Sequence, residues 1–249
     1  MTVTDRTQIP FSAILRDDPA ITPYFRDAYA KIRYATDENA IVAIDGPPGT
    51  GKTTCAVYAA DRVARPAVIV TMSDRPAPLD VLRHSYQAIT GERCGRLTRY
   101  DLGNLLRDAL PEWGGLLVVD ELQNAQVSAM KELVWLHETT RGGFALAAVG
   151  SNVLEAVTRY PQLESRVLTS ATFAPLDGDD LLGAVVRLHP GFALADPADV
   201  FVHDRVVCRG LIRTWAHTAR VLADDDPAVP VTGDRFAWAR SVLMARRSA

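Results

Sequence analysis

The residues best placed to do chemistry lie in the stretch DGPPGTGKTTC at positions 45–55. From Gly46 to Thr53 it follows the spacing Gly-x-x-x-x-Gly-Lys-Ser/Thr without a mismatch. Glycines in such a loop let backbone N–H groups turn towards phosphate oxygens, and the helix that follows presents its positive end to the same anion. Lys52 should reach the β- and γ-phosphates of ATP, and Thr53 should bind Mg²⁺. The expected nucleotide contacts are Gly46, Pro47, Pro48, Gly49, Thr50, Gly51, Lys52, Thr53 and Thr54.

A pair of carboxylates supplies the second half of the expected site. Asp120 ends the apolar run LLVVD, and Glu121 follows it directly. In the P-loop scheme an aspartate in this place binds Mg²⁺ together with the loop residue Thr53. The adjacent glutamate is placed to polarise an attacking water, so ATP hydrolysis is the expected reaction. Small-molecule kinases with the same loop need a pocket for a substrate hydroxyl and often lack the second acid. The other interpretation is two solvated acids at the end of a strand.

Polar residues also follow another apolar run, in the order Gly150, Ser151, Asn152. The carboxyl ends of parallel strands meet at one edge of a sheet, where ligands of open α/β sheets bind. A polar side chain at that edge can orient water against the γ-phosphate. Alternatively, Ser151 or Asn152 caps the helix that the segment NVLEAVTRY predicts, and the two roles can coexist.

The elements that position these residues are visible as short apolar runs separated by stretches with helical spacing. Fully apolar strands that alternate with helices predict a parallel sheet covered on both faces. The predicted fold class is therefore α/β. The expected strands cover 40–44, 67–72, 116–120 and 144–150.

Helix ends and the later part of the chain give the domain boundaries. The segment 21–35 predicts a helix with Thr22 as its N-cap, and a further helix is expected to open at Asp101. After about Pro175 only helical spacing remains, which predicts a small all-helical C-terminal lid. The expected divisions are an N-terminal arm over 1–20, an α/β core over 21–174 and a helical lid over 175–249.

Composition narrows the function classes. The chain has 249 residues, of which 48% are hydrophobic and 23% charged, as in ordinary globular proteins. No apolar run approaches the roughly 20 residues that span a bilayer, and the first residues lack a secretion-signal pattern. We therefore expect a cytoplasmic protein without a membrane partner. The three cysteines and five histidines show no metal-ligand spacing.

The net charge of −3 argues against a protein that coats DNA by charge alone. One stretch is locally basic, with five arginines against three acidic residues, and it is either a solvated loop or a surface that contacts DNA. Those residues are Arg75, Arg83, Arg93, Arg96 and Arg99, against Asp74, Asp80 and Glu92.

Five blocks, taken in order, resemble one family: DGPPGTGKTT, LLVVDELQNA, FALAAVGSNVLEAV, LESRV and RGLIRTWAHTA. They are similar to the AAA+ ATPases of the transposition-helper group, which includes the phage Mu target-selection ATPase, the Tn7-type regulators and ExeA-like AAA+ ATPases. The resemblance covers about residues 20–220. It implies a P-loop AAA+ core with a parallel sheet and a helical lid. The P-loop and Asp-Glu motifs are generic, whereas the DELQNA and AVGSN…LESRV blocks are more particular to this branch.

The resemblance also implies roles for single residues. Asp120 and Glu121 match the Walker B motif, and Gln123 matches the polar position that follows it. Ser151 or Asn152 matches sensor 1, and the sequence does not separate the two.

Two arginines receive roles from the same resemblance. Arg166, in LESRV, matches the arginine finger that enters a neighbouring subunit's site, with Arg159 on the preceding helix as a rival. Arg213, in GLIR, matches the sensor-2 arginine of the lid and would contact the nucleotide. The catalytic set that results is Glu121, Asp120, Lys52, Asn152 and Arg166.

The function that the resemblance implies is ATP-dependent assembly on double-stranded DNA, as a ring or helical filament of identical chains. The assembled form would recruit or activate a transposase, and hydrolysis through Glu121 would drive disassembly. The Mu protein has a separate N-terminal DNA-binding domain, for which the expected arm over 1–20 is too short. The alternatives are an ExeA-like or signalling ATPase that acts on a protein client, and a helicase-loader-type ATPase.

Overall fold

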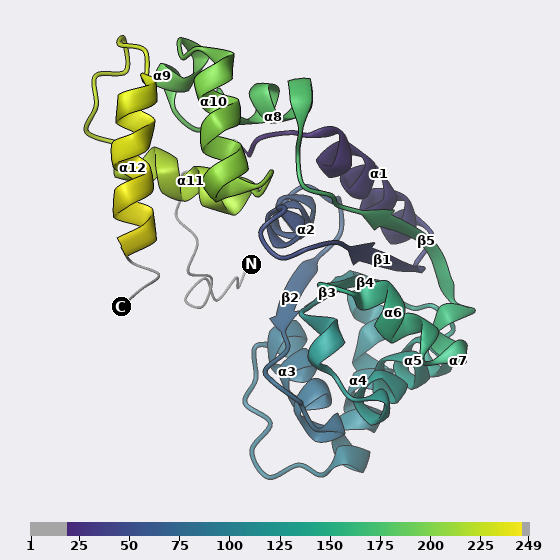
Figure 1. Ribbon diagram of the computed structural model, residues 1–249. Coiled ribbons are helices and arrows are strands. Elements are labelled where there is room, and N and C mark those ends of the chain that lie inside the picture. The colour runs from purple at the N-terminus through teal and green to yellow at the C-terminus, as the bar shows by residue number, and fades with distance from the viewer. Residues whose placement is uncertain (1–18, 246–249) are drawn as a thin grey trace. The chain divides into compact units, whose positions relative to one another are not determined.

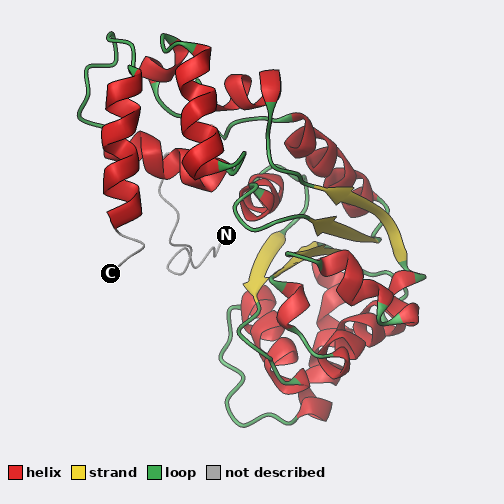
Figure 2. Cartoon of the chain, in the orientation of Figure 1, coloured by secondary structure: helices red, strands yellow, loops and turns green. Residues whose placement is uncertain are grey.

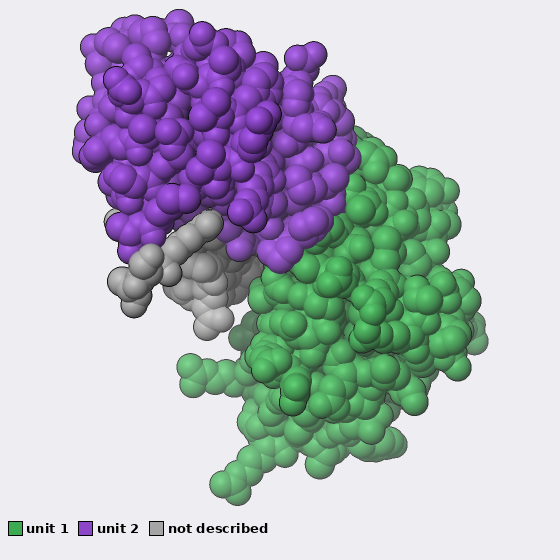
Figure 3. Space-filling model, in the orientation of Figure 1, with its two compact units in different colours: residues 1–12, 27–46, 52–172 green, residues 13–26, 47–51, 173–249 purple. Residues whose placement is uncertain are grey.

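The computed structural model describes residues 19–245, so nearly all of the arm expected at 1–20 lies outside the described residues. The chain divides into two compact units, which are coloured separately in Figure 3. The phosphate-binding loop contributes to both, because Gly46 and Lys52 belong to the first unit and the residues between them to the second. Within the described residues, the first unit comprises 27–46 and 52–172, and the second comprises 19–26, 47–51 and 173–245.

The first unit is built on a five-stranded parallel sheet with the order β2-β3-β4-β1-β5 (Figure 1). The α/β fold class is confirmed, and this strand order is that of an AAA+ core. The placement of β1 between β4 and β5 brings the end of β1 beside the end of β4. The strands are β1 (Ile41–Asp45), β2 (Ala67–Thr71), β3 (Leu116–Asp120), β4 (Ala145–Val149) and β5 (Val167–Thr172).

Strand β5 is absent from the sequence prediction, which found only the four apolar runs. Its sequence, VLTSAT, is half polar, and most of its residues are partly or fully exposed. An edge strand has a neighbour on one side only and needs no fully apolar run, which is why the search for apolar runs missed it.

Helices cover both faces of this sheet (Figure 2). Alternate strand residues such as Leu117, Val119 and Leu146 pack with α3, α4 and α5 into the larger hydrophobic core. Helices α1 and α2 lie on the opposite face. The helices are α1 (Pro23–Asp37), α2 (Lys52–Ala60), α3 (Pro78–Thr90), α4 (Arg99–Trp113), α5 (Val127–Thr139), α6 (Val153–Thr158) and α7 (Pro161–Glu164), with a 3-10 turn η2 (Leu122–Asn124) after β3.

The N-termini of two helices test the capping predictions. The backbone N–H of Phe25 donates to Thr22 Oγ1 at 3.1 Å, so the predicted cap of α1 is confirmed. Helix α4 does not open at Asp101 as expected. Thr98 is its N-cap and accepts from the Asp101 N–H at 3.2 Å, while the Asp101 carboxylate accepts from the Thr98 N–H at 3.0 Å. This reciprocal capping box shifts the helix start towards the N-terminus, and the hydrogen bonds from Thr98 lower the pKa of Asp101.

In the second unit, helices follow one another from residue 178 onwards, around a small aromatic core. The rings of Phe192, Trp215 and Phe236 have centroids 5.5 to 6.0 Å apart. None of the helices in residues 19–245 combines the length and the hydropathy that crossing a bilayer requires. The elements are α8 (Gly178–Val185), α9 (Pro190–Ala193), α10 (Pro197–His203), the π-helical segment η3 (Asp204–Cys208), α11 (Ile212–Val221) and α12 (Gly233–Ala245).

Polar side chains joined by hydrogen bonds lie beside that aromatic core. His203 Nε2 and Thr218 Oγ1 are 2.9 Å apart, and Trp215 Nε1 donates to Asp204 Oδ1 at 2.8 Å. The backbone N–H of Gly210 also donates to Asp204 Oδ1, at 2.8 Å. We call these residues the helical-unit network; they are His203, Asp204, Trp215 and Thr218.

Candidate nucleotide-binding site

Lys52 lies at the first turn of α2 and is buried at the carboxyl edge of the sheet. Its ammonium donates to the carbonyl of Gly46 at 2.7 Å and to Ser151 Oγ at 3.3 Å. Ser151 follows β4, which is hydrogen-bonded to β1, so the strand order brings these side chains together. A cation held at the start of a helix, between the ends of two parallel strands, is suited to bind a phosphate group.

Thr53 and Asp120 form the second contact at this edge. Thr53 Oγ1 donates to Asp120 Oδ2 at 2.8 Å, and the backbone N–H of Glu121 donates to Asp120 Oδ1 at 2.9 Å. Burial raises the pKa of Asp120, and the hydrogen bond from Thr53 opposes that rise. A hydroxyl and a carboxylate oxygen side by side are the hard ligands that Mg²⁺ prefers in phosphate sites, so Thr53 and Asp120 fit the predicted metal.

Glu121 has a left-handed backbone with φ of 57°, which is uncommon outside glycine and typical of functional sites. Its carboxylate oxygen Oε2 accepts a hydrogen bond from Gln123 Nε2 at 2.5 Å. The other end of the same amide, Gln123 Oε1, accepts from the backbone N–H of Ser151 at 3.1 Å. Gln123 therefore connects the end of β3 with the end of β4.

These contacts form one continuous group of side chains, which we call the carboxyl-edge network. The sequence predicted that most of these residues would share one sheet edge, and in the structure hydrogen bonds join them. The amide bridge was not predicted, because it depends on β3 and β4 being neighbours. The network consists of Thr53, Asp120, Glu121, Gln123, Ser151 and Lys52.

The two candidates for sensor 1 differ in their surroundings. Ser151 contacts Lys52, whereas Asn152 is exposed and has a left-handed backbone with φ of 59°. Asn152 occupies the N-cap position of α6, as one of the two alternatives expected, but its side chain makes no capping hydrogen bond. The N–H of Val153 donates instead to Asp45 Oδ1 at 2.9 Å. Asp45 ends β1, and only the adjacency of β1 and β4 could have revealed this role.

In the second unit, the tip of the phosphate-binding loop packs against α11. The backbone N–H of Arg213 donates to the carbonyl of Gly49 at 3.0 Å, and Thr50 Oγ1 donates to the carbonyl of Pro47 at 2.8 Å. Gly49 has φ of +86°, and a Cβ there would lie 3.3 Å from the Cβ of Arg213. The loop thus needs glycine for both its conformation and this approach, and Arg213 is held next to it.

The remaining loop residues differ in exposure. Pro47 and Pro48 are exposed, and Gly51 lies close to the side chain of Ile212. Thr54 is half-buried on α2.

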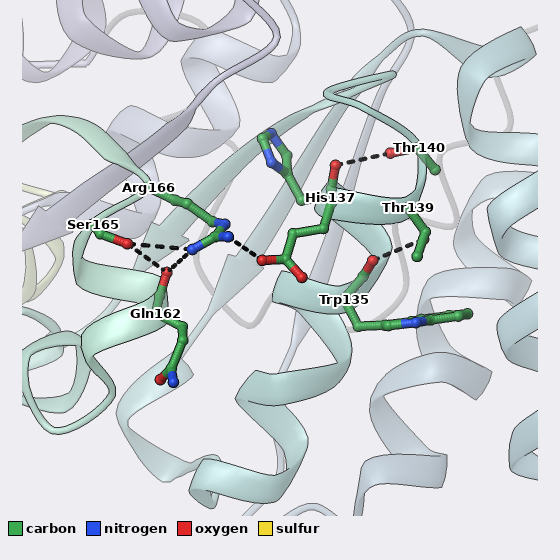
Figure 4. Close-up of polar contacts among 8 residues, drawn as sticks. Trp135, His137, Thr139, Thr140, Gln162, Ser165 and Arg166 are labelled. Carbon is green, nitrogen blue, oxygen red and sulfur yellow. Dashed lines mark hydrogen bonds and ion pairs between the residues drawn. The ribbon is translucent and has the colours of Figure 1, made fainter.

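Figure 4 shows the surroundings of Arg166. Its guanidinium forms an ion pair with Glu138 of α5 and donates to the carbonyl of Gln162 at 2.7 Å. It directly precedes β5, whose first residue, Val167, pairs with Ile41 at the amino end of β1. Arg166 therefore lies at the amino end of the strands, opposite the carboxyl-edge network. The rival Arg159 is exposed and paired with Glu155 on the same helix.

The basic stretch over 75–99 does not form one cluster. Arg83 pairs with Asp80 at 3.6 Å, and Arg99 pairs with the buried carboxylate of Glu132. Arg93 and Arg96 are exposed in the loop between α3 and α4. Arg75 lies in the loop before α3, so the positive charge is spread over two loops, a helix and the start of the next helix.

One sequence family matches the central part of the chain. Residues 35–157 match the model described as AAA domain, and this range includes the P-loop, the Asp120–Glu121 pair and Ser151. The segment is thus an AAA domain with a P-loop, which implies nucleotide binding. No curated protein matches the sequence.

Solved structures with the same fold belong to several proteins. RuvB of Thermotoga maritima, described as a Holliday junction branch migration motor, superposes with a TM-score of 0.58 at 16% identity, over 88% of this chain and 68% of that chain. Cdc6p of Pyrobaculum aerophilum gives 0.65 at 14% identity, over 82% and 63%. A Walker-type ATPase of Pyrococcus abyssi gives 0.59 at 12% identity, over 89% and 73%. At these identities the likeness shows the fold.

Proposed function

We propose that this chain is an ATP-dependent, DNA-binding AAA+ ATPase that assembles on DNA and recruits or activates a transposase at target sites. The observation that carries the nucleotide part is the carboxyl-edge network. In it, hydrogen bonds link Lys52, Thr53, Asp120 and Glu121 directly or through Ser151 and Gln123, which supports roles for them in binding phosphate and Mg²⁺ and in activating water. The resemblance of the blocks around Glu121 and Arg166 to transposition-helper ATPases supports the choice of client.

Each residue of the network has a role in this proposal. Lys52 and the loop amides would bind the triphosphate, and Thr53 and Asp120 would hold Mg²⁺, which would neutralise phosphate charge. Glu121 polarises the attacking water, and Ser151 or Asn152 orients that water against the γ-phosphate. Arg213 contacts the nucleotide from the lid.

The position of Arg166 supports a role in a neighbouring subunit. β5 has six residues, so a side chain before it lies roughly 20 Å from the carboxyl edge of the same sheet. An arginine side chain is too short to cross that distance within one chain. We therefore propose that Arg166 leaves Glu138 and stabilises transition-state charge in the site of the next protomer.

Exposed cations supply the proposed DNA contact. Arg93 and Arg96 are exposed on the loop between α3 and α4. Arginines bind phosphate oxygens, which suits contact with a nucleic-acid backbone. RuvB, which shares the fold, is described as a motor on Holliday junctions.

Sedimentation velocity tests the assembly. The full chain is run with a non-hydrolysable ATP analogue, with and without duplex DNA, at low and moderate salt. Large assemblies that need both nucleotide and DNA are the expected result. Assembly with nucleotide alone and indifferent to DNA would contradict the DNA part and favour a protein client. A monomer under every condition would contradict the oligomer.

Matched variants assign the DNA contact. The double variant Arg93→Ala/Arg96→Ala should weaken assembly on DNA and reduce its salt dependence, because fewer counterions are released. Arg141→Ala, an exposed arginine on another loop, is the control and should behave as wild type. Equal salt dependence in all three proteins would place the DNA contact elsewhere.

Mixing two inactive variants tests the action of Arg166 between subunits. Glu121→Gln supplies the arginine but no base, and Arg166→Ala supplies the base but no arginine. Their mixture should hydrolyse ATP although each alone does not, because composite sites form at their interfaces. Arg159→Ala should retain activity by itself. A mixture as inactive as its parts would contradict the role in trans.

A further inference from the structure

The side-chain amide of Gln123 is held at both ends. Nε2 donates to Glu121 Oε2 at 2.5 Å, and Oε1 accepts from the Ser151 N–H at 3.1 Å. A carboxylate only accepts hydrogen bonds and a backbone N–H only donates them, so a flipped amide would lose both contacts. The orientation of Gln123 is therefore set by its two partners.

Gly150 leaves the space that this amide occupies. A Cβ at position 150 would lie 1.9 Å from Gln123 Oε1, a distance at which one of the two groups must move. With the glutamine side chain removed, the nearest remaining neighbour of that Cβ is the Leu122 backbone nitrogen at 3.4 Å. An alanine at position 150 is thus incompatible with the amide bridge and compatible with its absence.

The bridge joins the candidate base to the phosphate-binding lysine. Ser151, whose N–H holds Gln123, also accepts from Lys52 through Oγ at 3.3 Å. At the other end, Gln123 draws the Glu121 carboxylate towards the end of β4, where water would meet the γ-phosphate. A hydrogen bond from a neighbouring side chain is the kind of contact that keeps a functional carboxylate in one orientation.

We propose that Gln123 is the positioning residue of the hydrolytic site: it fixes the Glu121 carboxylate to the backbone of Ser151 so that the base faces the attacking water. This inference rests on the proposed ATP hydrolysis and assigns a residue to it. Gln123 acts through Glu121 and does not touch the nucleotide. Its loss should slow turnover and leave nucleotide affinity unchanged.

Steady-state hydrolysis and binding of a fluorescent ATP analogue separate these effects. Gln123→Met keeps the length of the side chain and removes both hydrogen bonds. It should lower kcat by about tenfold to hundredfold, as expected for the loss of one hydrogen bond to a charged group, with the affinity unchanged. Gln126→Ala is the control, because Gln126 is exposed on the same segment and its side chain makes no capping hydrogen bond at the start of α5. It should match wild type.

A double-variant cycle tests the bridge itself. Gly150→Ala should lower kcat about as much as Gln123→Ala, because its methyl group displaces the amide. The double variant Gly150→Ala/Gln123→Ala should be no slower than either single variant, since the added methyl then meets no glutamine. Losses that multiply would show two independent structural effects and would overturn the proposal.

Three other outcomes would contradict the proposed role of Gln123. Unchanged or raised kcat in Gln123→Met, in a wild-type background that hydrolyses ATP, would overturn the positioning role and leave the proposed function intact. A wild-type chain that neither binds nor hydrolyses ATP would overturn both. A loss of analogue affinity equal to the loss of kcat would assign Gln123 to binding and contradict its action through Glu121.

Discussion

Each unit of the molecule contains hydrogen-bonded polar side chains that are buried or half-buried, and the two groups differ in what they hold in place. In the carboxyl-edge network, a lysine, an aspartate and a glutamate meet at the ends of parallel strands, and burial raises the pKa of Asp120. In the helical-unit network, His203 and Asp204 bind neighbouring side chains inside an aromatic core. Hydrogen bonding and burial alone therefore do not identify a site.

The two networks differ in their position in the fold and in the charge of their residues. Ligands of open α/β sheets bind at the carboxyl ends of the strands. Buried ionisable groups with shifted pKa values are concentrated at functional sites. Glu121 adds a left-handed backbone conformation at that edge. We expect substitutions in the carboxyl-edge network to change chemistry with little change in stability, and those in the helical-unit network to do the reverse.

The largest expected effect is that of Glu121→Gln. Loss of a general base slows a reaction by about 10²- to 10⁴-fold, so phosphate release should fall within that range. The melting temperature and the affinity for an ATP analogue should stay as in wild type. Glu112→Gln, an exposed glutamate on α4, is the control. Normal hydrolysis by Glu121→Gln would remove this residue as the base.

Lys52→Ala should weaken ATP binding next most strongly. In the proposed site the lysine donates charged hydrogen bonds to phosphate oxygens, and their loss corresponds to an affinity about a hundredfold lower. Titration with a fluorescent ATP analogue measures it. Lys131→Ala, an exposed lysine on α5, should bind as wild type does. Retained tight binding by Lys52→Ala would contradict the assignment of the phosphate-binding loop.

In the helical-unit network, Asp204→Ala should lower the free energy of unfolding by about 1–3 kcal/mol, because the buried Trp215 N–H then lacks an acceptor. Asp204→Asn keeps an acceptor oxygen and should cost less. Denaturant unfolding followed by tryptophan fluorescence measures both. If Asp204→Ala is as stable as wild type, this hydrogen bond does not stabilise the unit and the comparison fails.

The smallest expected effect is a dependence on pH. Burial lowers the pKa of His203 from its ordinary value of 6.5 to about 4, with the charge of Arg240 adding to the shift. The unfolded chain takes up this proton near pH 6.5 and the folded chain does not. The contribution of neutral His203 to stability is thus fully present above about pH 6.5 and is lost as the pH falls towards 4.

Unfolding free energies at several pH values between 7.5 and 4 test this. Wild type should lose stability over that window, and His203→Gln, which cannot titrate, should lose less. Parallel curves for the two proteins would show that His203 is not the titrating group.

The sequence predicts which residues lie at the carboxyl edge better than it predicts the contacts among those residues. Loop spacing selected Lys52 and Thr53 as candidates, and the acidic pair after an apolar run selected Asp120 and Glu121. Those assignments need only local sequence and the rule that parallel strands end at one edge. The roles of Gln123 and Asp45 could not be predicted, because each depends on which strands are neighbours.

The elements of the fold were likewise predicted only in part. Apolar runs predicted strands β1 to β4, and helical spacing after residue 175 predicted the C-terminal helices. The edge strand β5 was not predicted, because polar residues interrupt its apolar pattern. The start of α4 was misplaced because Asp101 takes part in a capping box whose N-cap is Thr98.

One measurement tests the central claim most directly, that ATP binding holds the protein on DNA and hydrolysis releases it. Fluorescence anisotropy of a labelled duplex is followed after a limited amount of ATP is added to wild type and to Glu121→Gln. Wild type should bind and then release the duplex as ATP is consumed, while Glu121→Gln should stay bound. Equal release by both proteins, or equal binding without ATP, would contradict the account.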